Sequence, residues 1–186
     1  MDELELLCHR LAGGGPECAR IAEQARSLGA ERPRQLAFAV MACRELEAPA
    51  PADPAGDLRG AVAAELAAAG ARLPSVQREA LALRELLGLD HAAIGSVLEL
   101  DPNRVPAILG EARIALRAQL RGSATPAGTC VEHERTVRTA TVRQDGEPVS
   151  AGDTDWLFEH LGQCPECARA HAVMLEGSAA YRGWPA

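Results

Sequence analysis

The 186-residue chain contains no lysine and has no excess of positive charge. All 19 of its basic residues are arginine, and 26 acidic residues give a formal net charge of −7. A protein that wraps nucleic acid over its whole surface needs a positive surface to meet the phosphates. The charge balance therefore excludes extensive wrapping, although it allows a small basic patch on one helix.

The chain also lacks a long apolar run. No stretch approaches the length of about 20 residues that a membrane-spanning helix needs. The first residues, MDELELLCHRLAGGG, are acidic and lack the layout of a signal peptide. We therefore expect a cytoplasmic protein without membrane contact. Cysteines are normally reduced in that compartment, so paired cysteines there indicate metal or redox chemistry rather than structural disulfides.

Sequence patterns typical of enzymes are missing as well. We find no phosphate-binding glycine loop, no nucleophile accompanied by a base, and no carboxylate pair set in an obvious pocket. We therefore expect that the protein is not an enzyme.

The composition favours helices along the whole chain. Aromatic residues make up only 3%, while alanine, leucine and arginine dominate, and these are good helix formers. We predict an all-α fold. Segments 48–56 (APAPADPAG) and 122–129 (GSATPAGT) have the composition of linkers. They divide the chain into a helical N-terminal bundle (1–47), a central helical module (57–121) and a small C-terminal helical hairpin (130–186).

The N-terminal bundle holds three of the six cysteines, Cys8, Cys18 and Cys43. Cysteine packs well as a small apolar side chain, so we expect these three to fill the core. A second metal site is the alternative, but the spacing of the three residues matches no common ligand pattern.

The central module has the clearest helical pattern. We expect helices over 58–70 and 74–88, with Gly88 ending the second. Asp90 is expected to cap a short third helix and Asn103 a longer fourth helix. Two helices joined by such a brief turn are typical of a helix-turn-helix.

The sequence HLGQCPEC, residues 160–167, has the spacing of a zinc site. Zinc prefers four tetrahedral nitrogen and sulfur ligands. His160 and Cys164 are four residues apart and so share one face at a helix end. Cys167 follows Cys164 after a tight turn that contains Pro165, so that both sulfurs can reach one ion.

The fourth zinc ligand must come from an upstream segment. We assign it to His133, on the preceding helix, with Cys130 as the alternative. A segment this small, with few large apolar side chains, also needs added stabilisation, which a metal supplies. A thioredoxin-like redox pair is disfavoured because no βαβ pattern surrounds the cysteines, and haem attachment is disfavoured because Ala168, not histidine, follows Cys167. We expect a structural zinc, with redox or metal sensing as the alternative.

Residues 73–121 resemble region 4 of extracytoplasmic-function sigma factors. The matching features are LP, QREAL, LRELLGL, AAIGSVL, Val105 and EARIALR, in order and with the family's spacing. The resemblance implies a helix-turn-helix whose second helix docks in the major groove of the −35 promoter element.

The helix that would read DNA is poor in suitable side chains. Pro106, Ala107, Ile108 and Gly110 cannot form bidentate hydrogen bonds with base edges, and Glu111 has the wrong sign to face phosphate. We therefore expect weak, salt-sensitive DNA binding at most.

The candidate DNA-binding residues are Asn103, Arg104, Arg113 and Arg117. An exposed stripe of Arg104, Arg113, Arg117 and Arg121 would favour DNA contact, and pairing of these arginines with carboxylates would argue against it.

Residues 130–170 resemble the zinc-binding anti-sigma domain, whose pattern is an upstream histidine or cysteine followed by H-x3-C-x2-C. The match consists of HLGQCPEC, the sequence DGE at 145–147, and His133 near the usual position of the first ligand.

Residues 1–47 show a fainter similarity to sigma region 2. However, Phe38 is the only aromatic residue before position 58, and that region uses aromatic residues to melt promoter DNA. An unrelated helical bundle is therefore an equal alternative.

Together the two main resemblances imply a sigma-like transcription regulator. Its helix-turn-helix would bind RNA polymerase, a sigma factor or DNA, and its C-terminal zinc domain would regulate that binding. The alternative is an anti-sigma-like protein that sequesters a sigma factor without binding DNA.

Overall fold

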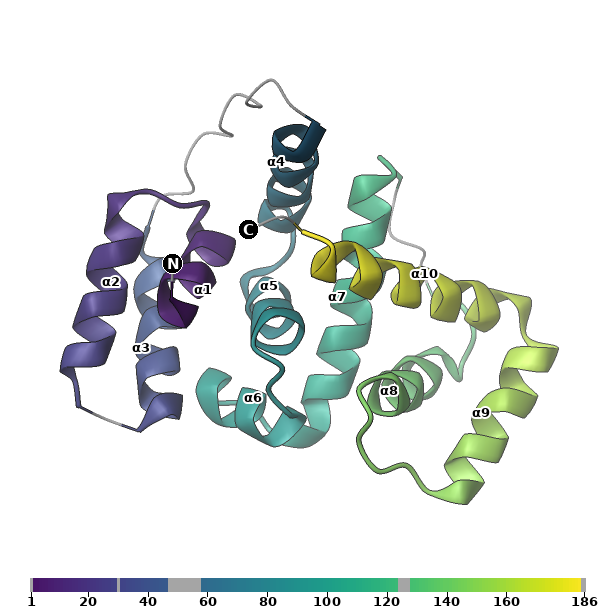
Figure 1. Ribbon diagram of the computed structural model, residues 1–186. Coiled ribbons are helices and arrows are strands. Elements are labelled where there is room, and N and C mark those ends of the chain that lie inside the picture. The colour runs from purple at the N-terminus through teal and green to yellow at the C-terminus, as the bar shows by residue number, and fades with distance from the viewer. Residues whose placement is uncertain (1, 30, 47–57, 124–127, 185–186) are drawn as a thin grey trace.

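The computed structural model describes residues 2–29, 31–46, 58–123 and 128–184. Within these ranges the chain forms ten α-helices, one π-helical turn and one 3-10 turn, and no strand, which confirms the predicted all-α fold. Figure 1 shows α1–α3 at one end of the molecule, α4–α7 in the middle and α8–α10 at the other end. The predicted linker 48–56 and residues 124–127 of the second linker lie outside the described residues.

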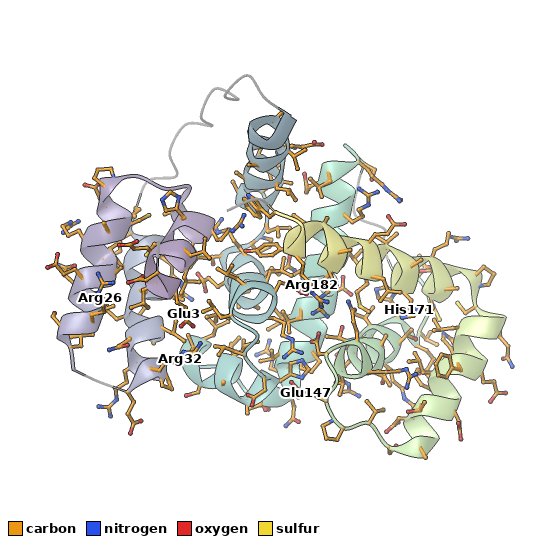
Figure 2. The ribbon with its side chains drawn as sticks, in the orientation of Figure 1. Glu3, Arg26, Arg32, Glu147, His171 and Arg182 are labelled. Carbon is orange, nitrogen blue, oxygen red and sulfur yellow. The ribbon has the colours of Figure 1, made fainter. Side chains whose placement is uncertain are left out.

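The N-terminal bundle consists of α1 (Glu3–Ala12), α2 (Pro16–Ser27) and α3 (Arg32–Arg44). Asp2 caps α1 by accepting a hydrogen bond of 2.9 Å from the Glu5 N–H, a contact that satisfies one of the unpaired donors of the first turn. Ion pairs Arg26–Asp2 and Arg32–Glu3 tie α2 and α3 to the start of α1 (Figure 2). Cys8, Cys18 and Cys43 are all buried in the core, as expected.

The central module contains α4 (Leu58–Ala71), α5 (Ser75–Leu81), α6 (His91–Leu98) and α7 (Val105–Leu120). Asp90 caps α6 as predicted, with its carboxylate accepting from the Ala93 N–H at 2.7 Å.

Asn103 does not cap α7. Asp101 instead caps a 3-10 turn over Pro102–Arg104 by accepting from the Asn103 N–H at 2.9 Å, and α7 begins at Val105. The reason is that Asn103 lies inside the 3-10 turn, where its side-chain amide donates to Asp101 at 3.1 Å.

A π-helical turn, Ala82–Leu86, follows directly on α5. Such turns insert one extra residue into a helix and often lie at functional positions. This one contains Arg84 and Glu85, and both side chains reach toward the C-terminal helices.

The C-terminal part consists of α8 (His133–Gln144), α9 (Ala151–Gln163) and α10 (Pro165–Arg182). The helix α8 begins at His133, three residues after Cys130, and α10 begins at Pro165. Beyond the far end of α10, Trp184 accepts a hydrogen bond of 2.8 Å from Arg10 of α1. The α10 segment therefore runs from its junction with α9 back to the N-terminal bundle (Figure 1).

The helix α7 lies at the centre of two apolar cores. The larger core joins it to α1–α6 and to Tyr181 of α10. The smaller core contains Ile114 of α7 and side chains of α8, α9 and α10, namely Val137, Ala140, Leu157, Ala170 and Met174. Consequently nine of the sixteen residues of α7 are buried and the other seven are half-buried.

Two glycines allow α8 and α10 to approach α7 closely. A Cβ at Gly110 would collide with Val137 and Thr141 of α8, and a Cβ at Gly177 of α10 would collide with the backbone of Arg113. Close packing of this kind leaves no space for a water layer between the helices. The C-terminal part is therefore packed directly onto α7.

Candidate metal centre

Four side chains with metal-ligating atoms meet where the segment before α8 reaches the α9–α10 junction. They are Cys130, His160, Cys164 and Cys167, and their ligand atoms all lie within 4.8 Å of one another. The Cys130 Sγ lies 3.7 Å from the His160 Nε2. Three sulfurs and one imidazole nitrogen form a donor set that structural zinc takes in tetrahedral geometry. The residues present therefore fit a zinc ion.

The α9–α10 junction positions three of these ligands. His160 lies in the last turn of α9, and Cys164 follows in an extended conformation (φ −113°, ψ 99°) that ends one helix and begins the next. Cys167 lies in the first turn of α10. Because Pro165 occupies the first position of α10, where an N–H would have no helical partner, it starts this helix without cost.

The two thiols of the CPEC sequence have different environments. Backbone N–H groups of Cys167 and Glu166 donate to the Cys164 sulfur and hold its pKa below the ordinary value, as is typical of a thiol at a helix N-terminus. Burial raises the pKa of Cys167 to about 12. Metal binding requires both as thiolates, so a bound zinc ion must displace the proton of Cys167.

Glu166 fixes the upstream ligand Cys130, a role that the sequence analysis missed. Its carboxylate accepts hydrogen bonds from the Thr129 N–H (2.5 Å), the Thr129 hydroxyl (2.7 Å) and the Cys130 N–H (3.3 Å). The Thr129 hydrogen bonds lower the pKa of Glu166. Glu166 thus ties the segment before α8 to the start of α10 and holds Cys130 beside the other ligands.

The imidazole of His160 is oriented by an aromatic stack. Its ring lies parallel to that of Trp156, with centroids 5.4 Å apart and an interplanar angle of 9°. The guanidinium of Arg135 covers Trp156 at 3.7 Å from the ring centroid and pairs with Asp153 at 3.2 Å. This arrangement restricts rotation of the ligand ring.

His133 lies outside the four-residue cluster, in which Cys130, the alternative fourth ligand, occupies the remaining position. The His133 Nε2 lies 3.1 Å from the Glu111 carboxylate of α7, and its Nδ1 is buried without a hydrogen-bond partner. The physical reason is the start of α8. His133 donates its N–H to the Cys130 carbonyl at 2.9 Å, and this turn directs Cys130 toward α10 and His133 toward α7.

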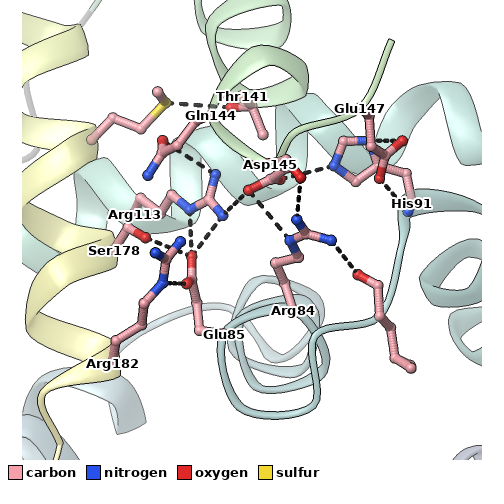
Figure 3. A network of polar contacts seen from close by, with 12 residues as sticks. Arg84, Glu85, His91, Arg113, Thr141, Gln144, Asp145, Glu147, Ser178 and Arg182 are labelled. Atoms are coloured by element: carbon pink, nitrogen blue, oxygen red, sulfur yellow. Dashed lines mark hydrogen bonds and ion pairs between the residues drawn. The ribbon is translucent and has the colours of Figure 1, made fainter.

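A second cluster of polar groups joins α7 to the C-terminal part, and Arg113 lies at its centre (Figure 3). Arg113 is fully buried. Its guanidinium lies 2.6 Å from both Glu85 and Asp145. Glu85 also accepts hydrogen bonds from two residues of α10, Ser178 at 2.9 Å and Arg182 at 2.6 Å. Arg113 is therefore corrected from a DNA-binding candidate to an internal ion-pair partner.

The cluster continues from Asp145 to α6. Asp145 lies 2.9 Å from the His91 Nε2 and 3.3 Å from the Arg84 Nε, and Glu147 lies 2.9 Å from the His91 Nδ1. Burial alone raises the pKa of Asp145, but the His91 hydrogen bond and the Arg113 and Arg84 charges outweigh it and hold the pKa below the ordinary value. The DGE sequence 145–147 thus contacts α6, the π-helical turn and α7 at once.

The remaining DNA-binding candidates do not form a basic stripe. Asn103 and Arg104 are exposed, and the Asn103 amide donates to Asp101 at 3.1 Å. Arg117 pairs with Glu176 of α10 at 2.7 Å, and Arg121 pairs with the same carboxylate at 2.5 Å. Three of the four arginines considered, Arg113, Arg117 and Arg121, are thus paired with carboxylates.

Comparisons with protein-family models, curated proteins and solved structures gave no match. In the parts of the chain that the structure describes, no helix combines the length and the apolar character needed to cross a membrane.

Proposed function

We propose that the protein is a sigma-like transcription regulator whose helix-turn-helix, α6 and α7, is held closed by a C-terminal zinc domain. The observation that carries this proposal is the burial of α7, the helix that would enter a DNA groove or a partner surface. Nine of its sixteen residues are buried and the other seven are half-buried, and α8 and α10 pack against it. A recognition helix in this state cannot reach base edges, because a helix must fit into the major groove to read them.

Zinc would be held by Cys130, His160, Cys164 and Cys167. When bound, zinc would cross-link the segment before α8 to the α9–α10 junction. The apolar core of this part is small, consisting of one α7 residue and five others, so its rigidity would depend on the metal. A rigid α8–α10 unit is what keeps Val137 and Met174 packed against α7.

The buried ionic cluster lowers the free-energy cost of separating α8–α10 from α7. Arg113, Glu85 and Asp145 are paired at 2.6 Å while they are buried, but the desolvation penalty of buried charges offsets much of the attraction. If α8–α10 moves away, these groups regain hydration. An interface of the same size built from apolar side chains alone would lose more free energy on opening, since nothing would compensate for the exposed area.

The paired arginines support a second candidate function, sequestration of a sigma factor without DNA binding. Arg117 and Arg121 share the carboxylate of Glu176, and Arg113 is buried. In a chain of net charge −7, three of the four arginines considered are paired with carboxylates. Arg104 alone of the four would then attract phosphate, so binding to DNA would be weak. The same surface could still contact a protein.

The two candidates are separated by a pull-down from native cell extract with the full, zinc-loaded chain and with its Asp145→Asn variant. A closed regulator should capture little RNA polymerase core as the wild type and several-fold more as Asp145→Asn, because loss of the Asp145 charge weakens the contacts to Arg113, Arg84 and His91. A sequestering protein should recover a separate sigma factor without core, to the same extent in both forms.

Glu134→Gln provides the matched control, since Glu134 lies on α8 but is exposed. It should behave as the wild type. Equal core recovery by wild type, Asp145→Asn and Glu134→Gln would contradict the closed-state proposal.

A further inference from the structure

The three cysteines of the N-terminal bundle lie close together, at the opposite end of the molecule from the candidate metal centre. Cys8 of α1 and Cys43 of α3 have their sulfurs 2.9 Å apart, and Cys18 of α2 is in hydrogen-bond contact with Cys8. Cys8 is fully buried, and Cys18 and Cys43 retain 1% and 6% exposure. Among the described residues, the C-terminal set alone has ligand atoms close enough together to hold a metal ion. The N-terminal thiols therefore require a different explanation.

We infer that Cys8 and Cys43 form a redox site that closes to a disulfide between α1 and α3. An S–S bond is about 2.05 Å long, so the sulfurs, 2.9 Å apart, need to approach by only roughly 0.9 Å. Because α1 and α3 already pack against each other, rotation of the two side chains can supply much of this movement. Cys18 is the third thiol of the same core and serves as the internal comparison.

A peroxide is the class of oxidant that is small enough to react with a thiol of such low exposure. Cys43 is the more exposed thiol of the pair and lies beside Arg44, Arg78 and Glu79, so its sulfur reacts first. The Cys43 thiol gives up its proton, its sulfur attacks one peroxide oxygen, and the O–O bond breaks. The leaving hydroxide takes up that proton, so the products are a sulfenic acid and one water. The Cys8 thiol then attacks the sulfenic sulfur and releases a second water. In total the two thiols lose two electrons, and the peroxide is reduced to two waters.

The surroundings of the thiols make this reaction slow. The hydrogen bond from Cys43 and burial both raise the pKa of Cys8, and burial raises the pKa of Cys18 to about 11. Both are neutral thiols at neutral pH, and the thiolate is the nucleophile. Cys8 is fully buried and Cys43 is only 6% exposed, which also limits contact with the oxidant, so the site responds to sustained rather than brief oxidation.

The disulfide would form beside the joint between the N-terminal bundle and the helix-turn-helix. Arg44, the residue after Cys43, holds the buried Glu79 of α5 with two hydrogen bonds, of 2.6 and 2.5 Å. Cys8 and Cys43 are separated by 35 positions, and closing a loop of that size restricts the unfolded chain. Oxidation should therefore stiffen the bundle on which α5 rests.

The test is a peptide map of the full, zinc-loaded chain after exposure to hydrogen peroxide, followed by alkylation in denaturant and digestion with trypsin. The arginines place the three thiols in separate peptides, 1–10, 11–20 and 35–44. We expect peptide 1–10 linked to peptide 35–44, released by dithiothreitol, and a midpoint of thermal unfolding higher by on the order of 5–10 °C.

Cys18→Ala is the matched control, because it removes a thiol from the same core and should leave the linked peptide in place, while Cys43→Ala should abolish it. The wild-type map alone decides the matter if a variant folds poorly. A link through peptide 11–20, or over-oxidised Cys43 without any linked peptide, would overturn the assignment, as would unmodified Cys8 and Cys43 after prolonged oxidation.

Discussion

Arg113 of α7 and Asp145 of the turn after α8 lie 2.6 Å apart with both side chains fully buried. The first residue belongs to the segment that resembles sigma region 4, and the second to the DGE sequence of the segment that resembles an anti-sigma domain. One charge pair thus joins the two segments whose contact, in the proposed function, controls what the protein can bind.

Loss of Arg113 should strongly destabilise the protein. Arg113→Met leaves Glu85 and Asp145 buried without their common partner, which we expect to lower the free energy of unfolding by about 3–5 kcal/mol. Arg117→Met removes the same chemical group from the same helix, but its partner Glu176 is 44% exposed, so we expect a loss of about 0–1 kcal/mol. Urea unfolding followed by circular dichroism measures both. Similar losses of unfolding free energy in the two variants would show that the buried cluster stabilises the protein no more than the exposed Arg117–Glu176 pair does.

Acid should weaken the contact between α7 and the C-terminal part. The pKa of Asp145 lies below its ordinary value in the folded protein, so its contribution to stability is present above the unfolded pKa of about 4 and is lost as the pH falls through the folded pKa. Urea midpoints of zinc-free wild type and Asp145→Asn, measured between about pH 6 and pH 2, should differ most at the upper end and converge at the lower end. A difference that grows as the pH falls would contradict this sign.

Cys130 should matter more for zinc than His133. Cys130→Ala removes one of the four clustered ligands and should lower the zinc content of the purified chain or weaken its affinity by at least tenfold. His133→Ala should leave the zinc content unchanged, because His133 contacts Glu111 instead. Metal analysis combined with competition against a chromogenic chelator decides between them. Zinc loss in His133→Ala together with retention in Cys130→Ala would restore His133 as the ligand.

Glu166 should tune zinc affinity without being a ligand. Glu166→Gln keeps the size of the side chain but weakens the hydrogen bonds from Thr129 and Cys130. We expect zinc affinity to fall by about 10-fold while the stoichiometry at saturating zinc stays the same. Glu159→Gln is the control, since Glu159 is exposed on α9. An unchanged affinity in Glu166→Gln would mean that Cys130 is held by the metal alone.

Local sequence patterns predicted local structure well. Asp90 caps α6 because its carboxylate reaches an N–H three residues ahead, and Pro165 begins α10 because proline suits the first helical position. The grouping of His160, Cys164 and Cys167 followed from spacing along one short segment. In each case the partners are close in sequence, so the helical repeat alone fixes their relative positions.

Contacts between distant segments could not be predicted in the same way. Cys130 and His133 are one helical turn apart, and only the observed start of α8 decides which of them faces α10. The sequence predicted Arg113 as a DNA-binding residue because no nearby residue indicates its ion-pair partners. These partners, Glu85 and Asp145, lie 28 and 32 positions away. The π-helical turn that brings Glu85 into reach has no recognisable sequence signature.

The absence of lysine from the chain allows a direct test of whether the zinc domain keeps α7 closed. In Arg113→Lys the only amines are the new side chain and the N-terminus, so brief treatment with an amine-reactive reagent reports exposure of position 113, and Arg104→Lys reports an exposed position of the same module. With zinc bound, position 113 should be protected and position 104 labelled at once, and removal of zinc by a chelator should make position 113 reactive. Equal labelling of both positions with zinc bound, or protection of position 113 that survives zinc removal, would contradict the proposal that zinc holds the helix-turn-helix closed.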